Sequence, residues 1–141
     1  MKNNVRFVFK VRPDDFSSAG KVSSEIKKYL SQLGLAAPLI RRVVICTYEV
    51  EMNLVIHSLG GQIELEISNY LIHLYSIDQG PGIEHVELAM KEGFSTASEK
   101  AREMGFGAGM GLPNMKKQAY SFEINSSKSG TFIHMTYLIS G

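Results

Sequence analysis

Three polar side chains recur at a spacing of four residues in a segment that is otherwise largely apolar. Glu49, Asn53 and His57 stand at positions i, i+4 and i+8, which stacks them one turn apart on one face of a helix. A carboxylate, an amide and an imidazole in one row could bind or activate a polar ligand. Taken alone, the same row could also be a solvated helix face, so both interpretations stay open at this point.

A glycine-rich run over residues 105–111 is the second candidate. Glycine occupies every other position of the run: Gly105, Gly107, Gly109 and Gly111. A backbone without Cβ atoms can turn its amides toward an anion and approach it closely. Leu112 and Pro113 then open a helical pattern, with proline in its first turn, so the run ends at a helix N-terminus that favours phosphate.

The residues after this run exclude a Walker-type phosphate loop, in which a lysine and then a serine or threonine follow the last glycine. Leu112 and Pro113 stand there instead. We therefore predict that residues 105–111 form the hinge and closing edge of a lid. A flexible linker is the alternative, and the large apolar side chains of Phe106, Met110 and Leu112 are poor linker residues.

Asp78 opens a third polar segment, in which Gly80, Pro81 and Gly82 break regular structure. The carboxylate could contact a ligand that the two glycines leave room for. Two simpler interpretations stay open: Asp78 could cap a helix that begins near Ile83, and the glycines could serve a turn alone.

Hydrophobic periodicity predicts the elements that must position these residues. Alternation of apolar and polar residues indicates strands over 5–11, 62–68, 71–77, 122–124 and 131–139. Spacings of three and four indicate helices from Asp14 or Asp15 to about Leu33, from near Pro38 to before Gly60, over 84–91, and over 112–119. Residues 93–104 are predicted to be a mobile loop. The fold class is therefore α+β, a two-layer α/β sandwich whose mixed, mostly antiparallel sheet is covered on one face by helices.

Composition limits the classes of protein further. A chain of 141 residues with 44% hydrophobic content predicts one domain, residues 1–141, with a real core. The net charge of +1 argues against nucleic acid or a membrane surface as the main partner. The single cysteine, Cys46, suits a reducing compartment, and no signal peptide or membrane span is apparent. We expect a cytoplasmic protein.

The three polar segments occur in an order that resembles the GHKL superfamily of ATP-binding domains. Glu49 and Asn53 come first, the Asp78–Gly82 segment second, the glycine run third, and Gly130 with Thr131 last. The small size of the chain makes it most similar to the bacterial serine kinases that act as anti-sigma factors or stress-pathway switch kinases. The resemblance implies a GHKL-type (Bergerat) fold that binds ATP or ADP together with Mg²⁺.

The resemblance also assigns roles to the residues. Asn53 is expected to ligate Mg²⁺, which prefers hard oxygen ligands and keeps several waters. Glu49 is the expected catalytic residue, orienting or deprotonating a serine hydroxyl, whereas Glu51 faces away and is the weaker candidate. Asp78 would accept a hydrogen bond from the adenine amino group. The remaining cofactor-binding residues are expected at Gly80, Gly82, Gly105, Gly107, Gly109, Gly111, Leu112 and Thr131, with Lys100 or Arg102 neutralising phosphate charge.

Two classes of function follow from the resemblance. The first is a serine/threonine protein kinase that phosphorylates a small antagonist protein of the STAS type, with a sigma factor as a further partner and a homodimer as one assembly. The second is a non-catalytic module in which the bound nucleotide selects a protein partner. A third, the ATP-binding half of a histidine kinase acting in trans, is disfavoured because no helix hairpin with a phosphoacceptor histidine precedes the domain.

Overall fold

The computed structural model of the chain describes residues 5–80, 111–127 and 129–139. The helix expected over 84–91 and the loop expected over 93–104 lie outside these residues. Within them, no helix is long and apolar enough to cross a membrane. The elements are β1 (Val5–Val11), the 3-10 helix η1 (Phe16–Ser18), α1 (Lys21–Gln32), α2 (Ala37–His57), β2 (Gly61–Ile67), β3 (Leu71–Asp78), α5 (Gly111–Gln118), β4 (Ser121–Ser127) and β5 (Gly130–Leu138).

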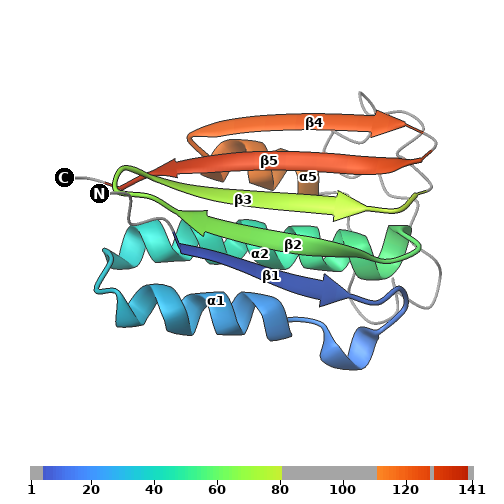
Figure 1. Cartoon of the computed structure of the whole chain (residues 1–141), viewed down its shortest axis with the longest axis horizontal. Coiled ribbons are helices and arrows are strands. Elements are labelled where there is room, and N and C mark those ends of the chain that lie inside the picture. Colours follow the sequence, from blue (N-terminus) through green and yellow to red (C-terminus); the bar gives the residue numbers. More distant parts are fainter. Residues whose placement is uncertain (1–4, 81–110, 128, 140–141) are drawn as a thin grey trace.

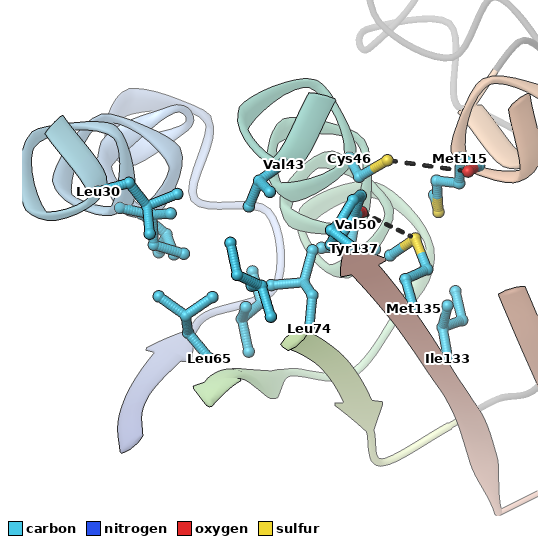
Figure 2. Packing of buried hydrophobic residues seen from close by; sticks show 14 of the residues in the cluster. Leu30, Val43, Cys46, Val50, Leu65, Leu74, Met115, Ile133, Met135 and Tyr137 are labelled. Atoms are coloured by element: carbon cyan, nitrogen blue, oxygen red, sulfur yellow. Dashed lines mark hydrogen bonds between the residues drawn. The ribbon is translucent and has the colours of Figure 1, made fainter. Parts of the chain in front are cut away.

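The described strands form one five-stranded sheet in the order β1-β2-β3-β5-β4. Every pairing between them is antiparallel. The helices α1, α2 and α5 lie together on one side of this sheet (Figures 1 and 2). The predicted two-layer α+β sandwich is therefore confirmed, and among the described strands the sheet is wholly antiparallel.

Helix α2 is the central element of the core. It begins with a proline in its first turn, and the apolar stripe that the sequence predicted is buried along its whole length. Figure 2 shows Val43, Cys46 and Val50 of this stripe above Leu65 of β2 and Leu74 of β3. The stripe consists of Leu39, Val43, Cys46, Val50 and Leu54. Packing against the sheet explains why this long helix is stable.

The side of the sheet away from the helices, which we call the open face, is less hydrated than the alternation of β2 suggests. Glu64 belongs to this face, yet it is only 5% exposed. Its carboxylate is paired with the Arg6 guanidinium and accepts a hydrogen bond of 2.7 Å from Gln62 Nε2. Hydrogen-bond donors that replace water reduce the cost of burying a carboxylate, so this part of the predicted polar face is covered by its own polar neighbours.

The start of α1 was predicted wrongly. The helix begins at Lys21, six or seven positions after the expected start at Asp14 or Asp15, and the residues between are the short η1 and two turns. Asp14 and Gly20 adopt positive φ angles of 57° and 94°, and the Asp14 amide donates to the Val55 carbonyl at 2.8 Å. Left-handed backbone interrupts a right-handed helix, so the tertiary contact with α2 overrides the helical periodicity here.

Candidate functional site

The polar face of α2 carries the first two candidate residues. Glu49 and Asn53 are both half-buried on this helix, one turn apart. Burial raises the pKa of the Glu49 carboxyl above its ordinary value, because desolvation disfavours the charged form. A carboxylate with a raised pKa is a better proton acceptor than a fully hydrated one. His57, the third member of the row, is the last residue of α2.

Asp78 ties the end of β3 to the start of β5. Its Oδ1 atom accepts hydrogen bonds from the Gly80 amide at 2.9 Å and from the Thr131 amide at 2.8 Å. Both bonds end on the same oxygen, so among the described residues no hydrogen-bond donor occupies Oδ2. The structure thus brings three predicted site residues, Asp78, Gly80 and Thr131, into direct contact and leaves one carboxylate oxygen for a further donor.

Gly130 is required for this arrangement. A Cβ atom at this position would lie 2.2 Å from the Asp78 carbonyl oxygen, and the φ angle is +147°. Both the contact and the dihedral exclude other residues. Next to it, the buried Thr131 hydroxyl is within hydrogen-bond distance of Ser126 Oγ, at 2.8 Å. The backbone of β5 can therefore approach Asp78 closely.

The loops that follow α2 and β3 are joined directly. The Leu59 amide donates to the Gly80 carbonyl at 2.7 Å, and the Gln79 amide donates to the Gly60 carbonyl at 3.0 Å. Gly61, which pairs with Asp78, lies against the side chain of Leu54 on α2. The C-terminal turns of α2 and the Asp78 cluster therefore lie at the same end of the sheet, as Figure 1 shows for the ends of α2 and β3.

Helix α5 begins where the glycine run was predicted to end. Gly111 is its first residue, and Leu112 is 5% exposed within the core. The Leu112 side chain is thus a packing residue, and only its backbone can serve a ligand. α5 packs beside α2, as the contact between them shows: the Cys46 thiol of α2 donates to the Met115 carbonyl of α5 at 3.8 Å (Figure 2).

The other predicted site residues lie outside the described residues. They are Gly82, Gly105, Gly107 and Gly109 among the cofactor-binding residues, and Lys100 and Arg102 among the phosphate-neutralising ones. The alternative role of Asp78, as cap of a helix near Ile83, also falls on a segment that is not described.

Glu51 has a role that sequence reasoning missed. It points away from the polar face, as expected, but it is only 2% exposed. Its Oε2 and Oε1 atoms accept hydrogen bonds from the Val22 and Ser23 amides at 3.1 and 3.2 Å. Burial raises the pKa of the Glu51 carboxyl, whereas the hydrogen bonds from the backbone amides act in the opposite direction and lower it. The only signal in the sequence is its position four residues from both Thr47 and Val55, which are buried as well.

A pair of histidines on the open face was also missed. His73 Nδ1 and His134 Nε2 lie 2.9 Å apart, and the Tyr75 ring stacks on His134 with the centroids 4.3 Å apart. Burial, followed by the neighbouring His73, lowers the pKa of His134. We call these two residues the imidazole pair. The polar side of β3 gave no hint that a residue 61 positions away would meet His73.

The antiparallel sheet with its single helical layer is an α+β fold of the kind that the resemblance to GHKL domains implied. Comparisons with known proteins agree. A crystal structure of the RsbU and RsbW domains of a Mycobacterium tuberculosis protein matches with a TM-score of 0.61 and 16% identity over 94% of this chain. This chain spans 32% of that longer one. SiaB, in the SiaB–SiaC complex from Pseudomonas aeruginosa, matches with a TM-score of 0.55 and 12% identity, covering 94% of this chain and 89% of that chain.

A curated protein is also similar to this chain in sequence. The chain is 28% identical over 116 residues to the serine/threonine-protein kinase RsbT of Bacillus subtilis, an alignment that covers 79% of each protein. No family model matches the chain. Both the fold and this sequence similarity confirm the resemblance to the anti-sigma regulatory kinases.

Proposed function

We propose that this protein binds ATP with Mg²⁺ and transfers the γ-phosphate to a serine or threonine of a protein partner. The observation that carries the proposal is the position of Glu49. It stands one turn from Asn53, half-buried and with a raised pKa, on the helix that ends beside the Asp78 cluster. Phosphoryl transfer needs little more from a protein than positioning, charge stabilisation and a base for the attacking hydroxyl.

The residues present fit a nucleotide and a metal ion. Asp78 Oδ2 has the chemistry to accept a hydrogen bond from the adenine amino group, since Oδ1 takes both described backbone donors. The Asn53 amide oxygen is the hard ligand that Mg²⁺ prefers, with phosphate and water completing its shell. Glu49 would orient the partner's hydroxyl and take its proton while the hydroxyl oxygen bonds to the γ-phosphorus and the bond to ADP, the leaving group, breaks.

Protein partners are supported by the relatives. SiaB is known in a complex with SiaC, and RsbW lies in one chain with RsbU. For this chain we propose a small STAS-type anti-sigma antagonist as the phosphorylated partner. A sigma factor as a sequestered partner, and a homodimer as the working assembly, belong to the same proposal.

Labelled ATP and purified STAS candidates provide the test. Wild-type protein should transfer label to a serine or threonine of one candidate, and Glu49→Gln should lower that rate at least ~100-fold while nucleotide affinity changes little. Glu25→Gln, an exposed glutamate on α1, is the matched control and should behave as wild type. No binding of ATP or ADP at millimolar concentration, with or without Mg²⁺, would overturn the nucleotide assignment itself.

The alternative function is a nucleotide-gated binding module without catalysis. The specific observation in its favour is that one structural neighbour is known as part of a two-protein complex. In this case Asn53→Ala and Asp78→Asn should abolish partner binding, whereas Glu49→Ala should leave it intact. A partner complex that is indifferent to nucleotide would exclude this alternative.

A further inference from the structure

The N-terminus of α1 is capped by a carboxylate from a different helix. The first amides of a helix have no partner within it, and Gly20, the N-cap residue here, offers no side-chain bond. Glu51 of α2 supplies the acceptors instead, one oxygen to the Val22 amide and the other to the Ser23 amide. A charged acceptor at this position also interacts favourably with the helix dipole.

Glu51 stands between the two proposed functional residues of α2. It is two positions from both Glu49 and Asn53, and two positions correspond to roughly 200° around a helix of 3.6 residues per turn. The same stretch of α2 therefore carries the proposed catalytic face on one side and the bond to α1 on the other. Any rotation of this stretch that re-aims Glu49 must also move Glu51 from the α1 amides.

Two further contacts hold the same region. The Tyr48 ring lies against Gly20, where an added Cβ would be 3.7 Å from its Cε1 atom. The Asp14 amide bonds to the Val55 carbonyl, one turn after Glu51. The chain before α1 thus follows the C-terminal half of α2, and Glu51 provides the only described charged contact between α1 and α2.

We propose that Glu51 is a positioning residue that fixes the rotation of α2, so that Glu49 and Asn53 face the nucleotide end of the sheet. This inference rests on the function proposed above. Its physical basis is that the two bonds are buried, so water cannot replace them when the carboxylate is lost. Misplacement of a catalytic group by about 1 Å can slow a reaction on the order of 100-fold.

Glu51→Gln is the direct test, because it keeps the shape of the side chain. The amide oxygen can accept one of the two N–H groups, whereas the amide nitrogen meets the other donor with hydrogens of its own. We expect kcat to fall ~10- to 100-fold and KM for ATP with Mg²⁺ to rise by a smaller factor of ~3-fold, because Asn53 moves together with Glu49. Glu25→Gln on the exposed side of α1 is the matched control and should leave both constants unchanged.

Hydrogen exchange provides a readout that does not depend on kinase activity. In Glu51→Gln the Val22 and Ser23 amides should exchange at least ~10-fold faster, while the β3 and β5 amides stay protected. Unchanged exchange at Val22 and Ser23 would overturn the bond between the helices. Faster exchange with a wild-type kcat would overturn the positioning role.

Failure of the proposed function gives a different result. If the wild-type protein binds nucleotide but transfers no phosphate, the proposed kinase activity is wrong. The positioning role is then measured by the Mg²⁺-dependent affinity for ADP. Glu51→Gln should lower that affinity, and equal affinity in both proteins would refute the role.

If Glu51→Gln does not fold, Glu51→Asp is the second variant, because it keeps the charge but shortens the side chain. It should lose ~3- to 10-fold in kcat, and a folded Glu51→Asp protein with wild-type kcat would refute the proposal.

Discussion

Replacing Asp78 separates its part in the fold from its part in ligand binding. Asp78→Ala removes the acceptor of two backbone bonds, from Gly80 at 2.9 Å and Thr131 at 2.8 Å. A hydrogen bond to a charged acceptor contributes roughly 1.5–3 kcal/mol. Because Asp78 is only half-buried, water replaces part of this, and we expect the free energy of unfolding to fall by about 2–4 kcal/mol. That is a large part of the roughly 5–15 kcal/mol of a typical domain.

Asp78→Asn is the matched variant. Its amide oxygen can keep both backbone bonds, so the free energy of unfolding should change by less than about 1 kcal/mol. The amide nitrogen then replaces Oδ2 and presents donors to the adenine amino group, so ADP binding should be lost. Urea unfolding followed by far-ultraviolet circular dichroism measures the first effect, and calorimetry the second.

Either of two results would refute this reasoning. An unfolding free energy of Asp78→Ala within about 0.5 kcal/mol of wild type would mean that the cluster does not hold β3 to β5. Normal ADP affinity in Asp78→Asn would mean that Oδ2 does not face the base.

Three further predictions test other parts of the structure. Gly130→Ala should lower the free energy of unfolding, measured by urea titration, by about 3 kcal/mol or more, because the strained φ angle and the 2.2 Å contact of the added Cβ both destabilise the fold. Gly34→Ala is the control, because its φ is +74° but an added Cβ meets no atom within 4 Å. It should lose only about 1 kcal/mol in the same titration. Burial raises the pKa of Cys46 to about 11, so the native thiol should not react with a disulfide reagent at neutral pH and should react once the protein is unfolded. The pKa of His134 is lowered in the fold, so the unfolded state takes up more protons below about pH 6.5 and stability should fall as the pH drops from 7 to 5. His134→Gln, which also removes the bond to His73, should show a smaller fall.

The sequence predicted those features that local pattern controls. The apolar stripe of α2 and the alternation of β2 both follow from periodicity over a few residues. The resemblance to a family assigned Asp78 and Thr131, 53 positions apart, to one site, and the hydrogen bond between them is a finding of the structure. The roles that depend on an absent ligand, at Glu49 and Asn53, stay predictions.

Contacts between distant elements explain what was missed. Periodicity predicted that α1 begins at Asp14 or Asp15. The hydrogen bond from Asp14 to Val55 and the left-handed conformation of Gly20 instead make the helix begin later in the chain, at Lys21. Glu51 has no local feature that distinguishes it from an exposed glutamate, since its partners lie on another helix. The meeting of His73 with His134 likewise depends on the pairing of β3 with β5.

The pairing of β3 with β5 has a consequence for how this chain can change in length. These strands are neighbours in the sheet although the chain between them runs from residue 79 to residue 129 and includes β4. Closing a flexible loop costs only about 0.6 kcal/mol more for each doubling of its length. The cost of bringing β3 and β5 together therefore depends little on the number of residues between them, whereas their pairing and the Asp78 carboxylate fix their register.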